Sequence, residues 1–160
     1  MEENKNVVRV SLDLRHVIDT VYACAHAAAL RGDISDARLA GIGERETLLT
    51  VCRNVLAGAA FVMAPALTAT NVNDRADSTP RGTYSGPMVV TFDIAVADGA
   101  NVEQVYAVLQ SLAVAGLLAA VTPADSSRAA VDAHAAALES LRRITSTLRL
   151  GLPSTLRPAI

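Results

Sequence analysis

Three histidines are the side chains of this sequence best suited to acid–base or metal chemistry: His16, His26 and His134. Cys24 lies two positions from His26 in a run predicted to be helical, and residues two apart on a helix point to different faces. The pair therefore cannot bind one ion together. No HxxxH, HExxH or CxxC spacing occurs, so the sequence indicates no zinc site, and we expect structural histidines.

Carboxylates and glycines give no clearer sign of catalysis. Asp93 and Asp98 are expected to be solvated, one in a strand and one in a turn. The segment Gly41-Ile42-Gly43-Glu44 precedes a predicted helix. It lacks the downstream glycine, the lysine and the preceding strand of the nucleotide-binding loops. We therefore expect no catalytic residue, no cofactor and no metal, and a chain that is not an enzyme.

Composition limits the classes of partner. The 160 residues are 51% apolar and 19% charged, with a net charge of −2, which is typical of one globular domain. Only 3% are aromatic, so stacking platforms for single-stranded nucleic acid are not expected. The longest uninterrupted apolar runs, Val55–Leu67 and Leu112–Val121, are shorter than a bilayer span, so we expect no membrane partner.

The elements that must position any site are mostly helical. Apolar residues recur at helical spacing in residues 14–31, 44–64, 101–121 and 123–148. The third range is apolar on every side, so we expect it to be buried on all faces at the centre of the others. Alternation with a period of two predicts strands at Val7–Leu12 and Met88–Ala97.

The predicted fold class is mainly α (α+β): a bundle of about four helices around the central apolar helix, with a small antiparallel β element made by the two strands. We expect a single domain over residues 1–160, a frayed N-terminus at 1–5 and an extended C-terminal arm at 149–160. Residues 68–86 are poor in apolar side chains. They predict a long loop, and loops of this length in compact domains are usually functional or disordered.

Two groups of polar residues are candidates for contact with a partner. One lies in the predicted 68–86 loop and one in the C-terminal region, and together they are Asp74, Arg75, Asp77, Arg81 and Tyr84, and Arg142, Arg143, Arg149 and Arg157. Cations near the C-terminal end of a helix are favourable in themselves, which accounts for part of the arginine excess. Otherwise the arginines form an arm that reaches an acidic surface on a neighbouring subunit, or nucleic acid.

From Tyr84 to the C-terminus the order of features resembles a group of uncharacterised proteins encoded in phages and prophages of Bacteroidales, near their neck and tail genes. The opening VVRVSLDLRHVIDTVYACA also resembles the first strand and helix of that group. The resemblance in the second half rests on the strand MVVTFDIAVADG, a helix with Tyr106 and Leu109, the turn Thr122-Pro123-Ala124-Asp125, an alanine-rich helix with Arg142 and Arg143, and a tail ending near Arg157-Pro158.

The resemblance implies a structural component of a tailed-phage virion at the neck or tail, made in the host cytoplasm. Such a head–tail connector, adaptor or tail terminator acts by homo-oligomeric ring assembly. Its partners are then other copies of itself and neighbouring virion proteins such as portal, connector or tail proteins, with contact to nucleic acid limited to DNA that passes through the ring. The group brings no catalytic residues.

Two alternatives remain open at the level of sequence. The first is a soluble helical binding or regulatory module that uses the 68–86 loop to hold a partner. The second is an enzyme of an unrecognised type, which requires a concave pocket with converging polar groups.

Overall fold

The computed structural model describes residues 7–30, 45–75, 84–96, 103–121 and 128–150. This part of the chain contains four helices and a three-stranded antiparallel sheet, which confirms the mainly α (α+β) class. In chain order the elements are β1 (Val7–Asp13), α1 (Leu14–Leu30), α3 (Arg45–Val62), β2 (Leu67–Thr70), β3 (Val89–Ala95), α4 (Glu103–Val121) and α5 (Arg128–Leu150).

The strand order is β1-β3-β2, with both outer strands antiparallel to β3. Period-two alternation places one face of the sheet on the core. Cross-strand pairs on that face are Val8 with Ile94, Val10 with Phe92, and Leu12 with Val90. All of these except the half-buried Val8 are buried.

The other face of the sheet carries polar pairs. Arg9 lies opposite Asp93, and its guanidinium donates to the two carboxylate oxygens at 2.7 and 3.1 Å. This hydrogen bond from Arg9 holds the pKa of Asp93 below its usual value. Opposite charges directly across two strands help to fix the register of β1 on β3.

The expectation of a two-stranded ribbon and of an unbroken loop at 68–86 was wrong. Residues 68–70 belong to the short strand β2, which pairs with β3 through an irregular register. The sequence TATN shows little hydrophobic alternation, because its side chains bind backbone and do not enter the core. Thr68 and Thr70 donate to the carbonyl oxygens of Asp93 and Thr91 at 3.0 and 2.8 Å.

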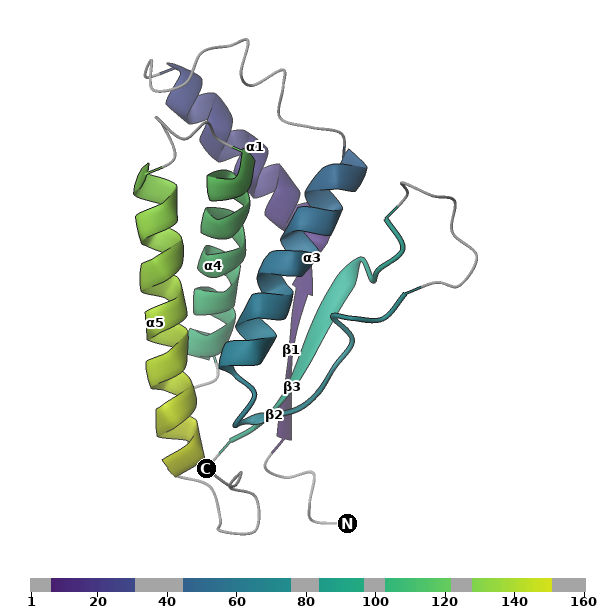
Figure 1. Cartoon of the computed structure of the whole chain (residues 1–160), viewed down its shortest axis with the longest axis vertical. Helices are drawn as coiled ribbons and strands as arrows, with labels where there is room; N and C mark the ends of the chain where they lie inside the picture. Colours follow the sequence, from purple (N-terminus) through teal and green to yellow (C-terminus); the bar gives the residue numbers. More distant parts are fainter. Residues whose placement is uncertain (1–6, 31–44, 76–83, 97–102, 122–127, 151–160) are drawn as a thin grey trace.

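The helices cover the core face of the sheet, with α3 and α4 between the sheet and the outermost helix α5 (Figure 1). The predicted stripe of α1 is confirmed where the structure describes it, since its apolar members are buried: Leu14, Val17, Ile18, Val21 and Ala25. Helix α3 buries Leu48, Leu49, Cys52, Leu56, Ala59 and Ala60. These side chains and those of the sheet form one core.

Helix α4 is central, but it is not buried on all faces as expected. It contacts α1, α3, α5 and β1, and it buries Val105, Leu109, Leu112, Ala113, Ala115 and Leu117. Most other side chains in its first two turns are exposed to solvent, and Tyr106 is 43% exposed. Uniform apolarity failed as a guide because alanines are tolerated equally well at buried and exposed positions of a helix.

By length and composition alone, the stretch Glu103–Ala120 within α4 could also cross a membrane, and 39% of it is buried inside this fold. Core helices of globular proteins meet the same criterion, so the finding by itself assigns no membrane contact.

Helix α5 departs from its prediction at both ends. Val131 is 48% exposed and Ala135 is also exposed. The apolar positions predicted from the helical spacing of residues 123–148 are therefore buried only from the middle of the helix, at Leu141 and Leu148. The helix also includes residues 149 and 150, which were expected to begin the extended arm. The rest of that arm, the N-terminal residues 1–5 and the Thr122-Pro123 turn lie outside the described residues.

Gly116 lies where three helices come close together. A Cβ atom at Gly116 of α4 would lie 2.6 Å from Cγ1 of Val55 on α3 and 3.1 Å from Cδ2 of His134 on α5. The contact with Val55 leaves no room for a methyl group without a shift, and the contact with His134 is tight. The ring of His134 therefore packs close to Gly116 at this junction.

We predict that Gly116→Ala destabilises the fold although alanine is the better helix former. Overpacking costs about 1–3 kcal/mol, against a gain in helix propensity of about 1 kcal/mol. Gly58→Ala in α3 is the matched control, because nothing lies within 4 Å of a Cβ there, and we expect it to stabilise the protein. Chemical denaturation of both variants tests this, and equal effects would contradict the close approach at Gly116.

Candidate docking surface

The structure describes six of the nine candidate interface residues at least in part. Asp74 and Arg75 follow β2, where the amide of Asp74 donates to the carbonyl oxygen of Asn71 at 2.9 Å, and both side chains are exposed. Asp77, Arg81 and Arg157 lie outside the described residues, and Arg149 is placed only as part of helix α5. The remaining three are Tyr84, Arg142 and Arg143.

Tyr84 joins the segment before β3 to helix α3. Its backbone amide donates to a carboxylate oxygen of Glu46 on α3, and its hydroxyl donates to the carbonyl oxygen of Pro87 at 2.7 Å. Burial raises the pKa of the phenol to about 12, so it stays protonated at neutral pH. A Cβ on Gly86 would lie 2.5 Å from the hydroxyl oxygen of Tyr84. Tyr84 is therefore an anchor for this segment.

A small polar hollow of about 180 Å³ lies beside Tyr84. Its lining comes from three parts of the chain: Thr50 and Arg53 of α3, Arg75 after β2, and Tyr84, Ser85 and Gly86 before β3. The structure thus brings together the predicted residues Arg75 and Tyr84. Sequence reasoning missed Arg53, Thr50 and Glu46. These residues are three and four positions apart, so they form a polar stripe on an otherwise apolar helix. That stripe is the feature of the sequence that indicates a polar site on this helix.

Arg142 and Arg143 lie far along the chain from this hollow, on exposed turns of α5. Arg142 approaches a carboxylate oxygen of Glu139 at 3.1 Å, and Arg143 approaches the other at 3.6 Å. One carboxylate is thus shared by two arginines, which leaves a net positive charge on this surface of α5. Exposed pairs of this kind contribute little to stability.

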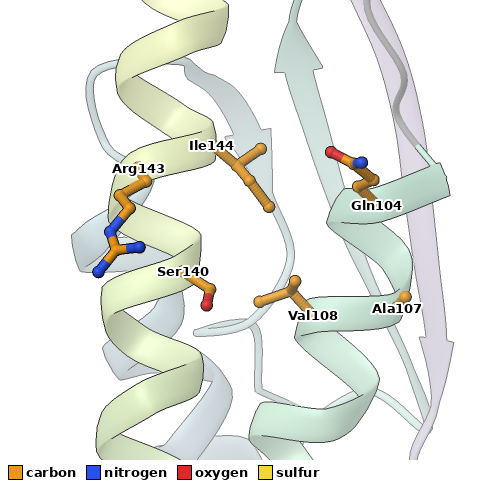
Figure 2. Close-up of a pocket in the computed structure, with 6 residues that line it drawn as sticks. All are labelled: Gln104, Ala107, Val108, Ser140, Arg143 and Ile144. Carbon is orange, nitrogen blue, oxygen red and sulfur yellow. The ribbon is translucent and has the colours of Figure 1, made fainter.

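A groove of about 410 Å³ lies between α4 and α5 and is lined by Gln104, Ala107, Val108, Ser140, Arg143 and Ile144. In Figure 2 the side chains of Val108 and Ile144 point toward each other across it, whereas the guanidinium of Arg143 points away. A second shallow groove of about 380 Å³ is lined mainly by alanine and other small or apolar residues of α1, α4 and α5. Neither groove gathers the converging polar groups that catalysis requires.

Cys52 is a buried thiol in the core formed by the described residues. Burial raises the pKa of the Cys52 thiol to about 12, so its reactive thiolate form is scarce at neutral pH. Among the described residues, no three His, Cys, Asp or Glu side chains lie close enough together to hold a metal ion.

Strand β1 lies at one edge of the described sheet and pairs only with β3. The amide of Leu14 donates to the carbonyl oxygen of Met88 at 2.9 Å. In an antiparallel pair, hydrogen-bonded and non-bonded positions alternate. Even-numbered residues of β1 therefore bond to β3, and Val7, Arg9 and Ser11 direct their N–H and C=O groups away from it. No strand within the described ranges pairs with this outer edge.

On the side of β3 that faces away from β1, the odd-numbered residues direct their N–H and C=O groups outward, and these groups have hydrogen-bond partners. The side-chain amide of Asn71 donates to the carbonyl oxygen of Val89 at 3.0 Å and accepts from the amide of Thr91 at 2.8 Å. The amide of Ala95 donates to the carbonyl oxygen of Ala66 at 2.8 Å. The side chain of Asn71 thus extends the hydrogen bonding of β2 to β3. Since β1 is longer than β2, the free edge of β1 is the longer open edge of the sheet.

Comparison with known proteins finds no family model, no curated protein and no solved structure that matches the chain.

We predict that Gly86→Ala destabilises the protein by about 1–3 kcal/mol because the new methyl group collides with the ring of Tyr84. The cost should fall to a few tenths of a kcal/mol in a Tyr84→Ala background, where the ring is absent. Chemical denaturation of the four proteins in this cycle measures the coupling. Purely additive effects would mean that Tyr84 does not pack on Gly86.

Proposed function

We propose that this protein is a structural component of a tailed-phage virion, at the neck or the tail, that acts by assembling into a homo-oligomeric ring. The phage assignment rests on the resemblance in the sequence. The assembly mechanism is supported by one observation above all, the seven-residue strand β1 whose outer edge has no partner within the described residues.

An open edge of this kind favours association. Unpaired N–H and C=O groups on an edge strand form a ready template for another strand, and addition of a strand is a common mode of protein recognition. Natural proteins often shield edges with proline, lysine or bulges. The strand VVRVSLD contains no proline or lysine and pairs with β3 without a bulge, and its charged Arg9 is paired with Asp93 across the sheet.

The direction of the strands is compatible with a ring. Both β1 and β2 are antiparallel to β3, so they run in the same direction at opposite edges of the sheet. A rotation can therefore bring β2 of one copy beside β1 of the next as a parallel pair. Such a contact joins two different surfaces, and repeated contacts of that type form a ring when the rotation between copies closes and an open filament when it does not.

The chemical character of the surface also favours assembly over catalysis. The grooves on α4 and α5 are largely apolar, and the two buried titratable groups with raised pKa values, Cys52 and Tyr84, stay protonated at neutral pH. Arg142 and Arg143 add positive charge at a second exposed surface. In this proposal they contact an acidic neighbour in the virion.

We predict that Ser11→Pro abolishes assembly and leaves the fold intact. The amide of Ser11 points outward, and proline is tolerated on an edge strand where the N–H faces solvent. Ser11→Thr is the matched control, because it keeps the amide and suits a strand. Mass measurement in solution should give an oligomer for the original chain and the control, and a monomer for the proline variant. Circular dichroism verifies that the fold is retained.

The same experiment separates the alternative function, a helical module that uses the 68–86 segment to bind another protein. A strict monomer that is also absent from phage particles would contradict the structural role and favour the binding module. If Ser11→Pro leaves the oligomer unchanged, the protein assembles through a surface other than β1.

A further inference from the structure

The polar hollow beside Tyr84 is not used by the assembly mechanism proposed above, and it has an unusual charge. It is lined by two arginines, Arg53 and Arg75, and by no acidic residue. Arginines that converge on one small space repel each other. They are usually held together by a carboxylate or a phosphate, which their planar groups bind through two parallel hydrogen bonds.

Neither guanidinium is neutralised within the described chain. Arg53 donates to the side-chain oxygen of its neighbour Asn54 at 2.6 Å, which is an uncharged acceptor. Arg75 makes no hydrogen bond or ion pair with another described residue. One carboxylate oxygen of Glu46, one turn before Thr50 on α3, accepts from the amide of Tyr84. Glu46 does not line the hollow, and it makes no ion pair with Arg53 or Arg75. Among the described residues, no acidic side chain lines the hollow or forms an ion pair with either of its arginines.

Two of the three hydroxyl groups in the lining already donate to backbone carbonyl oxygens, and the third is available to a ligand. Thr50 donates to the carbonyl oxygen of Glu46 at 3.1 Å, and Tyr84 donates to that of Pro87. Ser85 also lines the hollow, and its hydroxyl is able to donate. The donors available to a ligand are therefore the guanidinium N–H groups and one serine hydroxyl, which together suit an oxyanion.

The wall of the hollow is fixed before any ligand arrives. Tyr84 is bonded at both its amide and its hydroxyl, and Gly86 lies against its ring. Arg53 projects from the middle of α3, which is packed into the core. The cost of ordering this side of the site on binding is therefore small.

From this geometry we infer that Arg53 and Arg75 form a binding site for a phosphate group, supplied as inorganic phosphate or as a small phosphomonoester. Two positive charges match a dianion better than the single charge of a carboxylate. The volume of about 180 Å³ is below the range of about 300–1,000 Å³ for drug-sized ligands, which favours a small ion over a nucleotide. This inference is independent of the proposed virion role.

Calorimetric titration of the full chain with inorganic phosphate tests the site, at pH about 7.5, where the group is mostly dianionic, and at ionic strength held constant with chloride. We expect saturable binding by the original chain. Arg53→Gln combined with Arg75→Gln should weaken it about tenfold or more, because two charge-assisted contacts are lost. Arg75→Gln alone should weaken it several-fold, and it disturbs no described contact.

Arg15→Gln and Arg142→Gln are matched controls that remove exposed arginines elsewhere, and they should leave binding unchanged. A parallel titration with O-phosphoserine distinguishes a phosphomonoester from the free ion as the tighter ligand. Equal phosphate binding by the original chain and the double variant, or no saturable binding by the original chain, would overturn the inference. Binding of duplex DNA without binding of either small phosphate would overturn it in favour of a nucleic-acid contact.

Discussion

The structure depends on the hydrogen bonding of β3, because this strand is the only one of the described sheet with a neighbour on both sides. On one side it bonds to the even-numbered residues of β1. On the other it is satisfied by β2 and by the side chains of Thr68, Thr70 and Asn71. Buried backbone groups must be paired, so this arrangement completes β3 and leaves the outer edge of β1 as the longer open edge of the described sheet. The proposed assembly follows from that asymmetry.

The helical layer meets a different constraint, which is close packing of small residues. At Gly116 the backbone of α4 comes so near to Val55 that a Cβ would require a shift, and it also lies close to His134. This junction holds α3 and α5 against α4, and the core faces of α1, α3 and α4 then cover the sheet. A site beside Tyr84 is held by the same frame, since Glu46 and Arg53 project from α3. The assembly edge and the arginine hollow are thus two outward surfaces of one rigid core.

Periodicity in the sequence was sufficient for the class of fold, the strands β1 and β3 and the buried stripe of α1, because burial there follows a clean period of two or 3.6. Periodicity failed as a predictor where side chains bind the backbone or where alanine is the main apolar residue. Strand β2 was missed because its threonines and Asn71 bind backbone, and the exposed face of α4 was missed because alanine has little preference for inside or outside. Arg75 and Tyr84 were found as candidates, but Arg53 needed the three-dimensional packing of α3 against the segment before β3.

Amide hydrogen exchange of β1 tests the central claim most directly, by comparing concentrated protein with protein diluted until it is monomeric. In the monomer, the amide of Val10 should be protected by β3, while those of Arg9 and Ser11 exchange quickly. In the assembled protein we predict that Arg9 and Ser11 become as slow as Val10. Fast exchange at Arg9 and Ser11 in a proven oligomer, or a monomer at every concentration, would contradict assembly through this edge.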